Sequence, residues 1–188
     1  GVRVVAISGN DPLALRLDET GYSVWGDSFE EMKHHAREHQ WAFPYLYDGE
    51  TQKISRQYGP IATPHVFLFD ADRKLRFRGR IDSSEHIDQV KTHETRDAIE
   101  ALLEGREVAV ATTRTFGCSV KWSDYRTSAV EATKRWDQEG AELSSIDIEG
   151  IKDLIRNETD RFKLINVWAT WCGPCVAEFP ELVTIHRM

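Results

Sequence analysis

The chain has 188 residues, 29% charged and 40% hydrophobic, which is typical of a globular protein with one sizeable domain or two small ones. Its formal net charge of −7 argues against a nucleic-acid binder, because contact with phosphates rewards concentrated positive charge. No run of eighteen apolar residues occurs, so we expect no membrane-spanning helix, and three cysteines are too few for a disulfide-dense scaffold.

The first forty-odd residues predict a strand followed by a helix. Residues 2–7 form a nearly continuous apolar run, as expected of a strand buried on both faces of a parallel sheet. Residues 28–31, Ser-Phe-Glu-Glu, have the form of a capping box and open a helix that runs to about His39. Residues 43–47 are then predicted to be extended, and residues 51–58 to form a short helix that Gly59 ends.

Two histidines of the first predicted helix, His35 and His39, stand four residues apart and could share a metal ion. Glu38 and Lys33 beside them are more typical of a solvated helix face. We therefore expect no metal here, and none elsewhere in the chain.

A β-hairpin is predicted over residues 65–69 and 75–81. The returning strand alternates apolar residues at 75, 77 and 81 with arginines at 76, 78 and 80, which indicates one wet face. Helices are predicted over residues 93–104, 124–138 and 148–155, with a brief extended run at residues 108–110.

A cysteine pair follows the last apolar run, residues 164–168. Cys172-Gly-Pro-Cys175 precedes apolar residues at helical spacing, so the pair stands at a helix N-terminus. There the helix dipole favours an anion, and the Cys172 thiol should ionise more easily than a free one. Cys175 comes round the first turn and could resolve a mixed disulfide on Cys172. Zinc or an inert buried pair are the other readings of this spacing.

The motif WCGPC after INVWAT resembles the active site of the thioredoxin superfamily, and the following CVAEFP resembles its TlpA-like branch. The resemblance implies that Cys172 and Cys175 form a redox-active disulfide and that Glu178 handles protons. Asn166 stands where ordinary thioredoxins place a buried aspartate. The resemblance also implies that substrate contacts Trp171, Gly173 and Pro174.

Thr63-Pro64 precedes the hairpin and resembles the cis-proline of the same superfamily, which implies that the two residues bind an extended substrate strand. An ordinary trans proline is the alternative. The sequence GCS-x-KW at residues 117–122 resembles the end of a redoxin (AhpC/TSA-like) domain. Cys118 within it is either a small apolar residue or a redox accessory.

The resemblance predicts an α/β, thioredoxin-like fold in an unusual order. Residues 1–123 resemble a redoxin domain without its first strand and helix, residues 124–142 a linker helix, and residues 143–188 the start of a TlpA-like domain. A buried gap between strands would leave backbone groups unpaired. We therefore expect strand 163–168 to fill it, by circular permutation or by exchange with a second copy, in the sheet order 2–7, 163–168, 65–69, 75–81.

The sequence thus predicts a thiol-disulfide oxidoreductase that acts without a cofactor on protein thiols and disulfides, together with a redox partner protein. A strand-swapped dimer is possible. The alternatives are a peroxiredoxin-like peroxidase and a redox-inactive interaction module. The TlpA-like resemblance implies an extracytoplasmic location, periplasmic or secreted, although cytoplasmic thioredoxins carry the same CGPC. The chain opens without a basic, apolar leader, so we expect any signal peptide to have been removed or to lie upstream.

Overall fold

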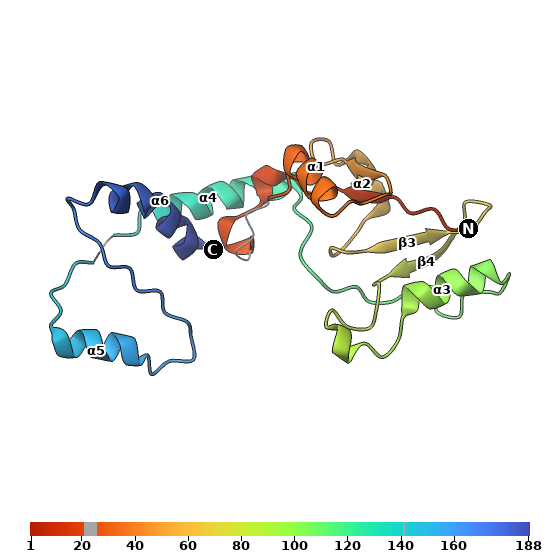
Figure 1. Cartoon of the computed structure of the whole chain (residues 1–188). Helices are drawn as coiled ribbons and strands as arrows, with labels where there is room; N and C mark the ends of the chain where they lie inside the picture. Colours follow the sequence, from red (N-terminus) through yellow and green to blue (C-terminus); the bar gives the residue numbers. More distant parts are fainter. Residues whose placement is uncertain (21–25, 141) are drawn as a thin grey trace. The chain divides into compact units, whose positions relative to one another are not determined.

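The structure of the chain, a computed structural model, describes residues 1–20, 26–140 and 142–188 (Figure 1). It divides into two units. The first comprises residues 1–15 and the described part of 24–129, and the second comprises the described part of 16–23 with residues 130–188. Each unit is described below by itself.

The first unit begins with a small parallel sheet. Strand β1 (Ala6–Ser8) pairs with β2 (Tyr45–Tyr47), with Ala6 opposite Tyr45 and Ser8 opposite Tyr47. Both strands were predicted, although residues 2–5 of the apolar run are not in a strand. A one-turn helix, η1 (Pro12–Ala14), and helix α1 (Phe29–Glu38) connect the strands.

Helix α1 begins at the predicted capping box. The Glu31 amide donates to the Ser28 hydroxyl at 3.3 Å, and the Ser28 amide donates to the Glu31 carboxylate at 3.0 Å. Two of the amides that have no partner inside the helix are satisfied in this way. The Phe29 ring stacks on Tyr47 of β2 at 5.5 Å, which holds the helix against the sheet.

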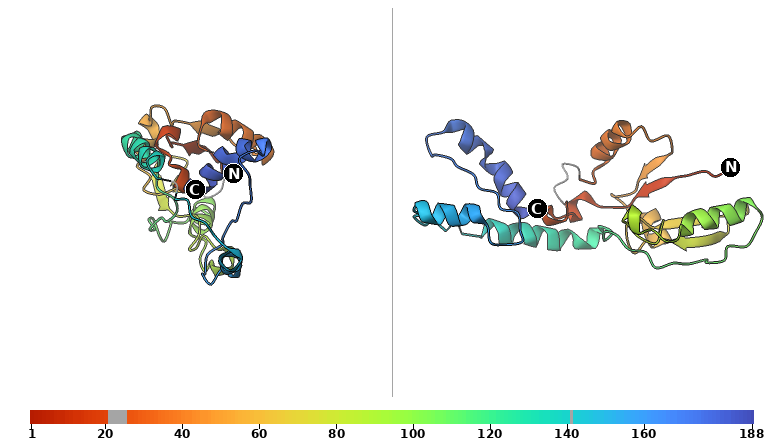
Figure 2. Two further views of the ribbon diagram at one scale, coloured as in Figure 1. Left: turned by 90° about the vertical axis from the view of Figure 1, so that its left-hand side faces the viewer. Right: turned by 60° about the horizontal axis from the view of Figure 1, so that its bottom comes forward.

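An antiparallel hairpin forms the second sheet. Strands β3 (Val66–Phe69) and β4 (Leu75–Gly79) pair with Val66 opposite Gly79. Helix α3 (Glu94–Leu103) lies along this hairpin, as Figures 1 and 2 show. Phe77 of β4 is fully buried, and Ala98 and Ala101 of α3 are buried with it, while Arg76 and Arg78 remain exposed as the alternation predicted.

Buried polar groups fasten the end of the first unit to its beginning. Helix α2 (Lys53–Tyr58) ends at Gly59, which has a left-handed conformation, and Gln52, the residue before the helix begins, is buried. The side-chain amide of Gln52 donates through its nitrogen to the carbonyls of Gly9 and Lys121 at 2.7 and 2.9 Å, and its oxygen accepts from the Ser123 backbone amide at 2.9 Å. The buried Asp11 carboxylate accepts a hydrogen bond from Arg126.

The second unit consists mainly of helices. Helix α4 (Arg126–Asp137) runs into it from the first unit and is followed by α5 (Ile148–Arg156) and α6 (Gly173–Arg187). Short 3-10 turns are also present: η2 (Leu17–Glu19) in this unit, and η3 (Ile87–Gln89) and η4 (Ser123–Tyr125) in the first. The Asp147 side chain caps α5 by accepting from the Gly150 amide at 2.9 Å.

The predicted strand at residues 163–168 is wrong for the isolated chain. These residues are exposed and have no regular secondary structure. Among the described residues β1 pairs with β2 and β3 with β4, so the expected order 2–7, 163–168, 65–69, 75–81 is not formed. The physical reason is that a strand needs the backbone of another segment to complete its hydrogen bonds, whereas a helix completes them within itself.

The predicted mixed α/β class is confirmed, since the first unit combines both sheets with helices. Within the ranges that the structure describes, no helix has both the length and the apolar character needed to cross a membrane.

Candidate functional site

The cysteine pair stands at the first turn of α6. Cys172 is the residue before the helix, and its sulfur is joined to Cys175 in a disulfide with the Cα atoms 5.3 Å apart. The Cys172 amide donates to the Ala169 carbonyl at 3.0 Å, and its own carbonyl accepts from the Val176 amide at 3.1 Å. The disulfide confirms the prediction that Cys175 comes round beside Cys172, and both cysteines are half-buried.

The neighbours of the disulfide present an open surface. Trp171 is 88% exposed, and Gly173, Pro174 and Glu178 are exposed as well. Glu178 lies on α6 three residues after Cys175, about one helical turn along. Asn166, which the resemblance compared with a buried aspartate, is exposed. The half-buried disulfide is therefore bordered by exposed residues, and Glu178 follows on the same helix.

Helix α6 continues through Pro180. Proline has no amide to donate to the Val176 carbonyl, so one hydrogen bond of the helix is missing at that point. The Thr184 hydroxyl donates to the Pro180 carbonyl at 3.0 Å, and the Trp168 ring packs edge-on against Phe179 at 4.4 Å. The last contact links the segment before the cysteines to the helix after them.

In the first unit, the peptide bond between Thr63 and Pro64 is cis, as the resemblance predicted. Thr63 is paired with Cys118. The Thr63 amide donates to the Cys118 carbonyl at 2.8 Å, and the Cys118 amide donates to the Thr63 carbonyl at 3.1 Å. The backbone groups of Thr63 that were expected to bind a substrate strand are therefore bonded to the chain itself.

Gly117 permits this close approach. A Cβ atom on Gly117 would lie 2.2 Å from the Thr63 carbonyl oxygen, and the residue adopts a φ of +129°, which side chains rarely tolerate. The glycine of the GCS-x-KW motif is thus required by the Thr63 pairing. Cys118, next to it, is a free and exposed thiol rather than a buried apolar residue.

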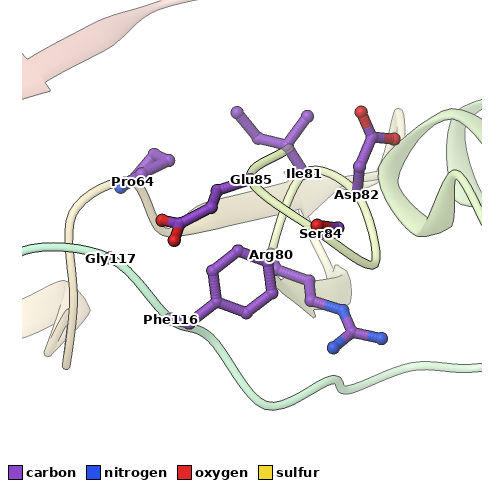
Figure 3. A pocket seen from close by; sticks show the side chains of 8 residues that line it. All are labelled: Pro64, Arg80, Ile81, Asp82, Ser84, Glu85, Phe116 and Gly117. Carbon is purple, nitrogen blue, oxygen red and sulfur yellow. The ribbon is translucent and has the colours of Figure 1, made fainter. Parts of the chain in front are cut away.

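A cavity of about 220 Å³ lies beside the cis-proline (Figure 3). Its wall combines apolar side chains with ionisable ones, and the lining residues are Pro64, Arg80, Ile81, Asp82, Ser84, Glu85, Phe116 and Gly117. The arrangement can hold an apolar side chain against the Pro64 and Phe116 rings while charged groups stand at its edge.

Arg80 is held in this wall by two partners. Its Nε atom donates to the Glu94 carboxylate at 2.9 Å, and its guanidinium lies 5.6 Å from the centre of the Phe116 ring. Burial by itself raises the pKa of Glu94, but the hydrogen bond from Arg80 and further hydrogen bonds outweigh it and hold the pKa below its usual value. The pair is therefore charged at neutral pH.

His65, directly after the cis-proline, is a neighbour of the site that the sequence did not single out. Burial, and then the positive charge of Arg78, lower the pKa of its imidazole. The ring stacks on Phe67 at 4.5 Å, and its Nδ1 atom accepts from the Ile61 amide at 3.3 Å. A neutral ring fits both contacts.

The predicted residues are thus grouped within each unit. Thr63 and Pro64 lie with Gly117 and Cys118 in the first unit, and Cys172 and Cys175 are joined on α6 in the second. Sequence reasoning missed the part of the wall that Arg80 and Phe116 form. The signal was present in part, because Arg80 is one of the alternating arginines and Phe116 directly precedes GCS-x-KW.

Comparison with known proteins supports a thioredoxin-like relationship for part of the chain. No protein-family model matches it. The thioredoxin-like protein YneN of Bacillus subtilis (strain 168) is 30% identical over 67 residues, which are 35% of this chain and 39% of that protein. The chain therefore spans about two fifths of the length of this curated relative.

Two solved structures are similar in fold and sequence. A hypothetical protein from Sinorhizobium meliloti 1021 is 29% identical with a TM-score of 0.54, covering 65% of this chain and 63% of its own. An uncharacterized conserved protein from Geobacillus kaustophilus is 39% identical with the same TM-score, covering 65% of this chain and 61% of its own. The chain is thus similar in part to a thioredoxin-like protein, whereas its relation to the TlpA-like and redoxin branches stays a prediction.

Proposed function

We propose that the chain is a thiol-disulfide oxidoreductase that exchanges disulfides with protein substrates through Cys172 and Cys175. The observation that carries the proposal is the Cys172–Cys175 disulfide at the start of α6, half-buried and bordered by exposed residues. In the reduced protein, the amides and the dipole of this helix end stabilise a Cys172 thiolate, which is the attacking species in exchange. The sequence similarity to a thioredoxin-like protein supports the same class.

The proposed reaction moves two electrons from the dithiol to the substrate. The Cys172 thiolate attacks one sulfur of the substrate disulfide, forms a mixed disulfide and releases the other sulfur as a thiolate. Glu178 takes up the Cys175 proton, and the Cys175 thiolate then attacks the Cys172 sulfur. The second substrate sulfur leaves, and the Cys172–Cys175 disulfide remains. A dithiol of a redox partner protein returns the pair to the reduced form by the same exchange.

Thr63 and Pro64 are proposed to contact the substrate strand, with the neighbouring cavity receiving one of its side chains. Trp171, Gly173 and Pro174 are proposed to contact the substrate beside the disulfide. Support comes from the position of Pro64 in the wall of that cavity and from the exposure of all three residues around Cys172. Because Thr63 is already bonded to Cys118, a strand that uses the same backbone groups must first displace residues 117–118. From the TlpA-like resemblance we propose an extracytoplasmic site of action.

Reduction of insulin by dithiothreitol tests the proposal. We expect the parent chain to accelerate insulin precipitation, Cys172→Ser to lose the acceleration, and Cys118→Ser to keep it. Cys118 is the matched control because it is also a cysteine and is exposed and unpaired. Unchanged turnover in Cys172→Ser would remove the oxidoreductase proposal. Peroxide consumption that depends on Cys118 would favour the peroxidase alternative instead.

We further propose that the thioredoxin-like sheet is completed by strand exchange between two copies, residues 163–168 of one chain pairing with the other. Two features support this proposal. Leu164 and Val167 of the segment are 71% and 88% exposed, and β1 and β3 each have one strand neighbour among the described residues. A free strand edge and an unpaired apolar segment are complementary.

Light scattering with Val167→Asp tests the exchange. In the isolated chain this exposed position tolerates a charge, whereas in a completed sheet the charge would be buried without a partner. We expect the parent to be dimeric and Val167→Asp to be monomeric. Val183→Asp, at a 42% exposed position of α6, is the control and should leave the dimer intact. A monomeric parent, or a dimer in both variants, would contradict exchange through this segment.

A further inference from the structure

A group of potential metal ligands that the cysteine chemistry does not use lies at the end of α1. His35, Glu38 and His39 each offer one ligand atom, and these atoms all lie within 4.8 Å of one another. Positions i, i+3 and i+4 share one face of a helix, which explains why the three side chains converge. Within the described residues, this is the group of three His, Cys, Asp or Glu side chains whose ligand atoms lie close enough together to hold a metal ion.

One of the three side chains has an unmet polar atom. The Nδ1 atom of His35 is buried and has no hydrogen-bond partner among the residues that the structure describes. A buried nitrogen without a partner costs on the order of 1–3 kcal/mol, so native proteins rarely leave one. This observation is independent of the spacing of the three residues, and it indicates a missing partner at this place.

An aromatic cluster holds the two imidazole rings together. His35 and His39 meet edge to face, with ring centres 4.3 Å apart. The Trp41 indole contacts both rings, at 5.1 Å from His35 and 5.9 Å from His39, and is itself stacked on Phe43 at 5.7 Å. The imidazoles are therefore oriented by packing before any ligand binds, which lowers the entropy cost of binding.

The electrostatics of the helix end favour a cation. Helix α1 ends here, because Gln40 adopts a left-handed conformation and the Trp41 amide turns back to the Ala36 carbonyl at 3.1 Å. The C-terminal end of a helix carries the negative pole of its dipole. Two basic residues lie on the same helix. Lys33 is paired with Glu30 and lies 4.8 Å over the Phe29 ring, so its charge is already engaged, and Arg37 of the last turn is exposed to solvent, which screens its charge.

We propose that His35, His39 and Glu38 bind a divalent transition metal ion of the zinc class, with water in the remaining coordination position. Two imidazole nitrogens and one carboxylate oxygen are a donor set that zinc accepts and that magnesium and calcium do not prefer. Zinc–ligand bonds of about 2.0–2.1 Å in a tetrahedron require donor atoms about 3.3 Å apart. Rotation of the exposed Glu38 and His39 side chains closes the present spacing of up to 4.8 Å.

Calorimetric titration with zinc chloride tests the proposal on the full chain, without an affinity tag. The Cys172–Cys175 disulfide is kept oxidised and Cys118→Ser is the parent, so that no free thiol competes for the metal. We expect one zinc ion per chain and no binding of magnesium chloride. Cobalt(II) chloride should give the visible absorption bands of a low-symmetry nitrogen and oxygen site, which provides a readout independent of heat.

The variants remove ligand atoms while keeping the rings. His35→Phe and His39→Phe retain aromatic packing against Trp41, and Glu38→Gln retains the shape of the carboxylate. Loss of a group that only orients a metal ligand typically lowers metal affinity about tenfold or more. Since the histidine variants remove a ligand itself, we expect each of them to weaken zinc binding by at least about tenfold. His34→Phe is the matched control, since His34 is exposed on the same helix and outside the group, and should bind zinc like the parent.

Equal zinc affinity in the parent and in His35→Phe/His39→Phe would overturn the proposal, and so would an equal loss in His34→Phe. Far-UV circular dichroism checks that each variant keeps its helices. Should His35→Phe unfold the helix, His39→Phe decides alone, because that position is exposed. A bound metal should also raise the midpoint of thermal unfolding of the parent as zinc is added, and not that of His39→Phe.

Discussion

The contacts inside the first unit differ in kind from the contacts inside the second. In the first, side chains join segments far apart in sequence: Gln52 bonds to Lys121 and Ser123, and Asp11 to Arg126. In the second, the ion pairs of Lys152 with Glu149 and of Arg156 with Asp153 are local, and the disulfide spans three residues. One exposed ion pair, Arg187 with Asp137 at 2.9 Å, joins segments that are 50 residues apart. Large apolar side chains such as those of Leu143 and Phe162 are fully exposed there.

The difference shows that residues close together in the sequence can determine the geometry of a cysteine pair, whereas the fold around it depends on contacts between residues far apart in the sequence. Cys-Gly-Pro-Cys needs its own four residues and one helix to bring the sulfurs together. The completed sheet that we propose as its support needs, in addition, a partner strand from a second copy. The first unit has the long-range side-chain contacts, and the second has the disulfide.

The largest expected effect separates the two units by burial. Phe77→Ala empties the centre of the first unit, where Phe77 is fully buried, and should lower the free energy of unfolding by about 3–5 kcal/mol. Trp171→Ala removes a larger ring that is 88% exposed in the second unit, and should change the free energy of unfolding by less than about 0.5 kcal/mol. Urea unfolding followed by far-UV circular dichroism measures both, and comparable losses would break the comparison.

The long-range hydrogen bonds give the next test. Gln52→Met keeps the length of the side chain but leaves the Gly9 carbonyl and the Ser123 amide without their Gln52 partner, whereas the Lys121 carbonyl still accepts from the Asp11 amide at 2.9 Å. At about 1 kcal/mol or more for each of these two groups, we expect a loss of about 2 kcal/mol in the same urea assay. Gln138→Met, at an exposed position of the second unit, is the control. A loss no larger than that of the control would show that these bonds do not hold the first unit.

The smallest effect concerns a local device inside the first unit. Ser28→Ala removes the cap of α1 and should cost about 1 kcal/mol. The hydrogen bond from Ser28, followed by that from the Gly26 amide, lowers the pKa of Glu31 in the folded protein. Because the pKa of Glu31 is lower in the folded protein than in the unfolded chain, its ionised carboxylate stabilises the fold at pH values above its unfolded pKa. That contribution to the free energy of unfolding is lost as the pH falls through its folded pKa.

Urea unfolding of Glu31→Gln against the parent at several pH values checks this sign. The parent should be the more stable at pH 7, and the difference should shrink as the pH falls below the ordinary carboxyl value of 4.5. A difference that grows on acidification would show that the capping carboxylate is not ionised in the fold.

Local patterns were read correctly from the sequence. The Ser28 capping box, the helix end at Gly59 and the hairpin of residues 65–81 depend on residues within a few positions of one another, and each was predicted. The pairing of Cys172 with Cys175 follows the same rule. The prediction of a cis bond at Thr63-Pro64 came from the family resemblance, because the local preference of an X-Pro bond favours trans.

Long-range features were not readable. The apolar run at residues 164–168 indicates a strand but carries no information on whether a partner is present, and no strand within the described residues pairs with it. The buried state of the His35 nitrogen depends on Trp41 folding back over α1, so the sequence favoured a solvated face for the same histidines. The wall formed by Arg80 and Phe116 likewise needs two segments to meet.

In the β-bridge between Thr63 and Cys118, Cys118 occupies the backbone groups of Thr63 that a bound peptide would use. A peptide that docks on the cis-proline through main-chain bonds gains access only in the fraction of molecules in which residues 117–118 have lifted away. Its observed dissociation constant therefore equals the intrinsic one divided by that fraction. Weakening the tether, for instance with a bulkier residue at Gly117, would tighten capture of foreign strands while loosening the fold that presents them.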